Sequence, residues 1–168
     1  MVDVGPKVFV ALGSNQGDPR RNVLSAMDRL ETLSTRPLVR SSLWETDPVD
    51  CPPGSPRFVN AVVGLYPEKE ENAETLLEKL LSLEKEFGRT PKKILNEPRP
   101  LDLDLIAFED RICASATLTL PHPRAHLRGF VLQPLFEIAP DLILPGQSAT
   151  ISQLANRLAP DPSIRKLT

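Results

Sequence analysis

Apolar and acidic residues alternate from Leu101 to Leu105, and an apolar run continues to Phe108. A period of two is typical of a β-strand, so Asp102 and Asp104 should share one face of the strand and the leucines the other. The two aspartates then lie about 6–7 Å apart along the strand, close enough for their charges to repel each other. A hard divalent cation, which prefers oxygen ligands, would compensate that repulsion. The alternative is an ordinary amphipathic strand whose acidic face is solvated.

The segments around this strand indicate the fold class. Apolar periodicity predicts strands at residues 7–12, 38–44, 58–65, 101–108 and 117–120, and helices at about 73–88, 133–139 and 151–158. Capping residues predict where helices begin: Asp18 before a helix that opens at Pro19, Asn72 before the helix at 73–88, and a capping box of Thr150 and Gln153 at the start of the last helix. The order strand, helix, strand, strand, helix, strand predicts an α+β, ferredoxin-like βαββαβ core. We expect a mostly antiparallel sheet with helices packed on it, C-terminal additions, and one domain over residues 1–168.

Composition excludes several classes of protein. The net charge of −2 provides no basic field for nucleic acid, and no stretch of about 18 apolar residues exists to span a membrane. Cys51 and Cys113 are isolated in sequence and have no metal-ligand spacing, and the sequence leaves their redox state open. We therefore expect a cytoplasmic monomer that binds neither nucleic acid nor membrane.

Charged residues elsewhere in the chain converge on the acidic strand. Glu84 falls within the apolar stripe of the second predicted helix, so it lies either at the edge of the sheet or in a polar cleft. Basic residues flank the two aspartates on both sides, namely Arg89, Lys92, Lys93 and Arg99 before them and His122, Arg124 and Arg128 after them. A lone basic loop is usually a solvated surface, but cations around a metal-binding carboxylate pair are typical of a polyphosphate site.

A set of short motifs extends this interpretation to nearly the whole chain. They are Ala11-Leu12-Gly13-Ser14-Asn15, Phe58-Val59-Asn60-Ala61, Leu83-Glu84 with Gly88-Arg89, Pro98-Arg99-Pro100-Leu101-Asp102-Leu103-Asp104, Leu118-Thr119-Leu120-Pro121-His122, Arg128-Gly129-Phe130-Val131-Leu132 and Pro134-Leu135-Phe136-Glu137-Ile138-Ala139-Pro140. In content and order the chain closely resembles the 6-hydroxymethyl-7,8-dihydropterin pyrophosphokinases, enzymes of folate biosynthesis. The Arg-x-Leu-Asp-Leu-Asp element together with Leu-Pro-His is highly specific.

The resemblance implies a reaction and a set of roles. ATP would donate its terminal diphosphate to the hydroxymethyl oxygen of the pterin and release AMP, with two Mg²⁺ ions held by Asp102 and Asp104. Arg89 and Arg99 would act with these aspartates in catalysis. Residues implied to contact ATP are Glu84, Arg99, Leu105, Leu118, Thr119, His122 and Arg128. Residues implied to contact the pterin are Thr46, Phe58, Asn60 and Phe130.

The departures from the family pattern lie near one loop. Family members commonly carry Arg-Trp-Gly-Pro-Arg where this chain has Leu95-Asn96-Glu97-Pro98-Arg99, so the aromatic residue is replaced by Asn96, and Pro91 replaces an arginine. Lys92 or Lys93 can substitute for that arginine. From its polar composition we expect the loop at 89–98 to be mobile without ligand and to hold the pterin less tightly.

Three other functions compete with this one. A nucleotidyltransferase would carry its Gly-Ser close to its Asp-x-Asp, whereas Asp102 lies 88 residues after Ser14. A ferredoxin-like RNA-binding module would need aromatic residues on its central strands and a basic face. A relative that has lost activity through its altered loop stays open.

Overall fold

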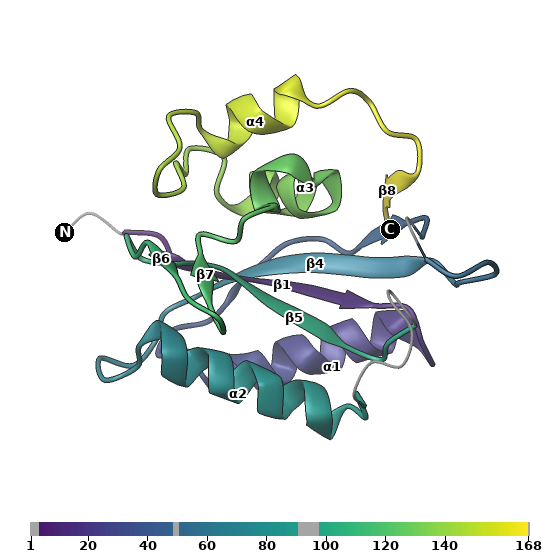
Figure 1. Cartoon of the computed structure of the whole chain (residues 1–168), viewed down its shortest axis with the longest axis horizontal. Helices are drawn as coiled ribbons and strands as arrows, with labels where there is room; N and C mark the ends of the chain where they lie inside the picture. Colours follow the sequence, from purple (N-terminus) through teal and green to yellow (C-terminus); the bar gives the residue numbers. More distant parts are fainter. Residues whose placement is uncertain (1–3, 49–50, 91–97, 168) are drawn as a thin grey trace.

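A six-stranded antiparallel sheet lies between two layers of helices (Figure 1). The computed structural model describes residues 4–48, 51–90 and 98–167. The strands of this sheet are β1 (Val8–Ser14), β2 (Val39–Arg40), β3 (Trp44–Thr46), β4 (Phe58–Leu65), β5 (Asp102–Phe108) and β8 (Ile164–Lys166). The helices are α1 (Pro19–Glu31), α2 (Ala73–Glu86), α3 (Gly129–Ile138), α4 (Ile151–Arg157) and the 3₁₀ turn η1 (Ala125–Leu127), and a small ribbon pairs β6 (Cys113–Ala114) with β7 (Thr119–Leu120).

The strands follow the order β5-β1-β4-β3-β8, and β2 pairs with the C-terminal end of β4. This arrangement confirms the predicted α+β class with a mostly antiparallel sheet. The single strand predicted at 38–44 is wrong, because the structure divides it into β2 and β3. Ser41 lies at the break and accepts the Val62 N–H with its hydroxyl at 2.9 Å, where regular pairing would use a backbone carbonyl. Strand β8 was not predicted, since only three residues of ordinary composition form it.

The helix boundaries follow from local capping. The carboxylate of Asp18 accepts the Arg21 N–H at the start of α1, and Asn72 and Thr75 form a reciprocal capping box at the start of α2. Thr150 and Gln153 form the predicted capping box of α4. Among the described residues, no helix is long and apolar enough to cross a membrane.

Two apolar clusters hold the layers together. Side chains of α1 and α2 pack on one face of the sheet, and those of α3 and α4 pack on the other face (Figure 1). Leu101, Leu103 and Leu105 belong to the first cluster. Their shared burial confirms the predicted alternation and leaves Asp102 and Asp104 on the face that carries α3.

A bulge in β5 separates its polar half from its apolar half. Leu105 pairs with Val10 and Ala107 with Phe9, so Ile106 is an extra residue. Ile106 and Ala107 both join the cluster beneath α3 and α4. The strand therefore presents carboxylates at one end of the sheet and core side chains at the other.

Candidate functional site

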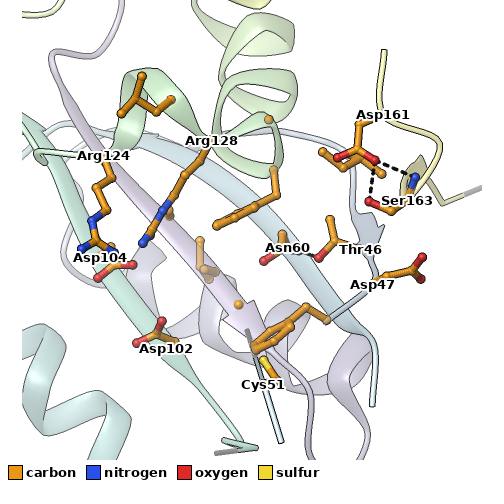
Figure 2. Close-up of a pocket in the computed structure, with 18 of the residues that line it drawn as sticks. Thr46, Asp47, Cys51, Asn60, Asp102, Asp104, Arg124, Arg128, Asp161 and Ser163 are labelled. Carbon is orange, nitrogen blue, oxygen red and sulfur yellow. Dashed lines mark hydrogen bonds between the residues drawn. The ribbon is translucent and has the colours of Figure 1, made fainter. Parts of the chain in front are cut away.

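A cavity of about 540 Å³ opens on the α3 face of the sheet (Figure 2). Strands β1, β3, β4 and β5 form its floor, and the N-terminus of α3 and the segment that ends in β8 form its walls. Its lining residues are Ala11, Leu12, Gly13, Thr46, Asp47, Cys51, Phe58, Asn60, Arg99, Asp102, Asp104, Arg124, Leu127, Arg128, Gly129, Phe130, Asp161, Ser163 and Ile164. Eight of these residues were predicted as site residues from the sequence: Thr46, Phe58, Asn60, Arg99, Asp102, Asp104, Arg128 and Phe130.

One end of the cavity combines carboxylates with guanidinium groups. Arg124 and Arg128 extend from the segment before α3 toward Asp104, and Asp102 lies beside it on β5 (Figure 2). Asp102 accepts Arg89 Nη1 at 2.5 Å with Oδ1 and Arg99 Nη1 at 3.3 Å with Oδ2. These groups can bind a multiply charged anion, because guanidinium forks match phosphate oxygens.

The same end offers a partial cation site. Burial, together with the charge of Asp102, raises the pKa of Asp104 to about 6. A neighbouring cation would favour the ionised form, so this carboxyl group suits a divalent ion. Within the described ranges no three Asp, Glu, His or Cys side chains cluster as a complete metal shell. Asp102 and Asp104 therefore fit Mg²⁺ only if oxygens of a bound small molecule and of water complete the octahedral coordination of the metal.

Glu84 lies behind β5, on the α2 side of the sheet, and does not line the cavity. The residue is 5% exposed, and its Oε2 accepts the Leu103 N–H at 2.8 Å and Arg89 Nη1 at 2.8 Å. Burial raises the pKa of Glu84 to about 7, against the opposing effects of the Leu103 N–H and of Arg89. Glu84 thus connects α2 to the edge of β5 and orients Arg89 toward Asp102, and its contact with ATP stays a prediction.

The raised pKa of Glu84 predicts a pH-dependent stability. The folded protein binds this proton more tightly than the unfolded chain, so this contribution is greatest below pH 4.5 and is lost as pH rises through about 7. Glu84→Gln keeps an acceptor for the Leu103 N–H but does not titrate. We expect the free energy of unfolding of the wild type minus that of the variant to fall by about 3 kcal/mol between pH 4 and pH 8. Urea unfolding across that range measures it, and a flat difference would contradict it.

Asn15 holds the backbone next to the acidic strand. It is fully buried, its Oδ1 accepts the Arg99 N–H at 2.8 Å, and its own N–H donates to the Arg99 carbonyl at 3.1 Å. Its Nδ2 donates to the Pro56 carbonyl at 3.4 Å. The sequence marked Asn15 only as the last residue of a family motif, and this role was not predicted. A polar residue directly after a buried strand was a further signal.

Two aromatic rings line the cavity next to the arginines. Phe58 lies under the guanidinium group of Arg99, at 5.8 Å, and Phe130 under that of Arg128, at 5.4 Å. Thr46 and Asn60, which are each 6% exposed, line the cavity beyond them. Asn60 Nδ2 donates to Thr46 Oγ1 at 2.9 Å, which leaves Asn60 Oδ1 as an acceptor. A Cβ added to Gly13 would lie 3.2 Å from that oxygen, so a larger residue at position 13 would crowd it. These side chains can hold a flat ring that has a donor edge.

The remaining residues predicted to contact ATP lie outside the cavity lining. Leu105 and Leu118 are buried in the cluster under α1 and α2, while Thr119 is exposed on β7. His122 is partly buried, and burial followed by the charge of Arg128 lowers its pKa below the ordinary value. Its Nδ1 accepts the Arg124 N–H at 3.2 Å, so a neutral ring carries its proton on Nε2.

The structure adds residues that the sequence did not reveal. Asp161, Ser163 and Ile164 reach the cavity from the C-terminal segment, and Asp47 and Cys51 reach it from the loop after β3. No sequence motif contains them, because they lie in the loop after β3 and in the C-terminal segment, and the position of both depends on the whole fold. Pro91, Lys92, Lys93 and Asn96 lie outside the described residues, so the expectations about the loop at 89–98 remain expectations.

A family model and individual known proteins both match this chain, and they point to the same family. Residues 9–140 match the family described as 7,8-dihydro-6-hydroxymethylpterin-pyrophosphokinase (HPPK). A 2-amino-4-hydroxy-6-hydroxymethyldihydropteridine pyrophosphokinase of Pseudomonas aeruginosa is 40% identical over 140 residues, which cover 83% of this chain and 84% of the relative. The enzyme of the same name from Haemophilus influenzae is 37% identical over 158 residues, 94% of this chain and 96% of the relative.

Solved structures agree with the fold. The crystal structure of Plasmodium falciparum HPPK-DHPS wild type with STZ-DHP superimposes with a TM-score of 0.64 at 13% identity. The match covers 92% of this chain and 43% of that longer chain. At this identity the likeness concerns the fold alone, an α+β arrangement with a mostly antiparallel sheet.

Proposed function

Because this chain belongs to the 7,8-dihydro-6-hydroxymethylpterin-pyrophosphokinase family, we propose that the cavity on the α3 face is its active site and that residues 1–168 act as one catalytic domain. The protein is an ATP-using kinase of folate synthesis that transfers a pyrophosphoryl group to hydroxymethyldihydropterin. The proposal concerns which residues carry out this reaction. The observation that supports it best is that one cavity joins the carboxylate and arginine end to the pocket of Phe58, Asn60 and Phe130.

In this proposal the arginines bind the triphosphate of ATP. Arg99, Arg124 and Arg128 line the cavity beside the aspartates, and Arg89 reaches Asp102 from the end of α2. When the hydroxymethyl oxygen attacks the β-phosphorus, the bond to the α,β-bridging oxygen breaks, AMP leaves and the hydroxyl proton is lost to solvent. Negative charge on the transferring group and on AMP is then stabilised by these guanidinium groups. His122 can add an uncharged Nε2–H donor.

Asp102 and Asp104 would hold Mg²⁺ in the loaded enzyme. When bound, the metal neutralises phosphate charge and orients an in-line displacement. Arg89 and Arg99 each contact one oxygen of the Asp102 carboxylate, and release of these contacts would free both oxygens for the metal. Phosphate oxygens are the natural new partners for both guanidinium groups.

The pterin would occupy the part of the cavity lined by Phe58, Asn60 and Phe130. Asn60 would accept a hydrogen bond from the donor edge of the ring with its Oδ1, since Thr46 holds its amide nitrogen. Phe58 and Phe130 would cover the faces of the ring. The hydroxymethyl group would then point toward Asp102 and Asp104.

The nucleoside would extend from the acidic end along the outer edge of β5 toward β7. The side chains of Leu105 and Leu118 are committed to the core, so they would contact it through backbone groups. Glu84 would act through Arg89 and β5, and Thr119 offers an exposed hydroxyl group.

Product analysis tests the assignment of function. The protein is incubated with ATP, Mg²⁺ and 6-hydroxymethyl-7,8-dihydropterin, and nucleotides are separated by chromatography. We expect AMP and the pterin diphosphate in equal amounts. Formation of ADP instead of AMP, or no product, would contradict the proposal.

Orientation of Asn60 gives a separate prediction. Thr46→Val removes the acceptor of the Asn60 amide and leaves this buried group to reorient. We expect the KM for the pterin to rise roughly fivefold, equivalent to about 1 kcal/mol, with little change in the KM for ATP. Initial-rate kinetics with each substrate varied in turn measure this, and Thr35→Val, at an exposed residue outside the cavity lining, is the matched control. Equal effects on both substrates would contradict the assigned orientation.

A further inference from the structure

We propose that the C-terminal strand β8 is the outer wall of the pterin pocket and that Ile164 sets how closely Phe130 approaches the bound ring. The inference rests on the proposed function of the cavity and adds a residue that sets affinity for the pterin. The segment concerned lies beyond residue 140, where the match to the family ends.

The position of β8 follows from its pairing with β3. Ile164 lies opposite Thr46 in that antiparallel register, and Ile164 lines the cavity. The Asp47 N–H donates to the Ser163 carbonyl at 3.2 Å, which extends the pairing beyond the strand. Figure 2 shows Asp161 and Ser163 over the same end of the cavity as Thr46 and Asp47, far from Asp102 and Asp104.

Ile164 also touches the base of α3. A Cβ added to Gly129 would lie only 2.7 Å from Ile164 Cδ1, so the two residues already pack as closely as a glycine allows. Gly129 directly precedes Phe130, the residue proposed to stack on the pterin. Ile164 therefore separates β3 from the start of α3, and its size sets the spacing between Thr46 and Phe130.

Contacts within the protein hold the wall in place. Leu167 N–H donates to the Leu43 carbonyl at 2.8 Å, and Lys166 Nζ lies 3.2 Å from Glu137 Oε2 on α3. Before the strand, Asp161 Oδ1 accepts both the N–H and the hydroxyl of Ser163, at 2.9 and 2.6 Å. Because the protein's own contacts fix this spacing, a change at Ile164 should act on binding.

The first test compares Ile164→Ala with Ile112→Ala. Ile112 is 68% exposed, next to β6, and does not line the cavity, so it controls for loss of an aliphatic side chain. Titration calorimetry with 6-hydroxymethyl-7,8-dihydropterin in the presence of a non-hydrolysable ATP analogue gives the Kd of the pterin. We expect Ile164→Ala to raise it roughly five- to tenfold through lost packing, with the Kd of the ATP analogue and kcat within about twofold. Ile112→Ala should change neither Kd.

The second test examines the contact with Gly129 directly. Gly129→Ala should weaken pterin binding roughly tenfold, because its methyl group displaces Ile164. Ile164→Val lacks the Cδ1 atom that this methyl group would meet, so the double variant should bind the pterin within about twofold of Ile164→Val alone. If Ile164→Ala fails to fold, this cycle decides the question alone.

The outcomes separate this inference from the proposed function. A wild-type protein that binds no pterin would contradict the proposed function. A wild-type protein that binds pterin, with Ile164→Ala unchanged or with additive effects of Gly129→Ala and Ile164→Val, would contradict only the role of β8. Equal weakening of pterin and ATP analogue would also overturn it, because it would indicate general loss of structure.

Discussion

Replacing Asp102 or Asp104 by alanine is expected to reduce turnover by a factor of about 10³ or more while the protein stays folded. The loss corresponds to about 4 kcal/mol of transition-state stabilisation, a reasonable magnitude for removing one of two carboxylates from a metal-assisted phosphoryl transfer. Asp104→Ala should be at least as stable as the wild type, since burial and Asp102 already disfavour its charged form. Release of AMP measures turnover, and thermal unfolding followed by circular dichroism measures stability.

Asp110→Ala is the matched control for these two variants. Asp110 lies just beyond β5, is exposed, and does not line the cavity. Its loss should leave both rate and melting temperature unchanged. Near-normal turnover by Asp102→Ala or Asp104→Ala would show that the carboxylates are only the polar face of an amphipathic strand, the alternative that the sequence left open.

Replacing Arg89 by methionine is expected to damage both activity and stability. The guanidinium group joins Glu84 Oε2 to Asp102 Oδ1, so its loss leaves a buried carboxylate without its cation. At pH 8 we expect a loss of about 1–2 kcal/mol in the free energy of unfolding, limited because Glu84 can take up a proton. Turnover should fall about 10²–10³-fold through the missing phosphate contact.

A double variant separates the two effects of Arg89. Glu84→Gln removes the uncompensated charge, so Arg89→Met with Glu84→Gln should regain most of the stability and none of the activity. Urea unfolding at pH 8 and the AMP assay measure the two quantities. Arg111→Met, which breaks an exposed ion pair with Glu74, is the control and should change neither appreciably. Recovery of turnover in the double variant would mean that Arg89 serves only the fold.

Sequence reasoning predicted the fold where local signals were strong. The strand Phe58–Leu65 and the caps at Asp18, Asn72 and Thr150 are confirmed because propensity, period and capping agree there. Strands β2, β6 and β8 span two or three residues, too few for a period to show. Their existence depends on neighbouring strands and helices that no local window contains.

The lining of the candidate site was predictable where its residues lie in motifs on regular elements. Asp102, Asp104, Asn60 and Phe130 all line one cavity, and the roles that the resemblance implies for them stay predictions. The orienting roles of Asn15 and Glu84 were not predicted, because a hydrogen bond to a backbone group distant in sequence leaves no pattern. The wall formed by Ile164 was missed for a similar reason, since pairing between β3 and β8 joins residues that are far apart in the chain.

The hydrogen bonds of Asn15 to the Arg99 backbone affect how Arg99 can change its binding partner. With its main chain held on both sides, Arg99 needs only rotations about side-chain bonds to move from Asp102 to a phosphate group. The Arg99 side chain is 14% exposed, so its rotation is slower than the picoseconds to nanoseconds of an exposed side chain, but it needs no rearrangement of the backbone. Arg99 can therefore exchange Asp102 for an arriving phosphate group without a loop movement, and the time that this takes depends on breaking the ion pair with Asp102.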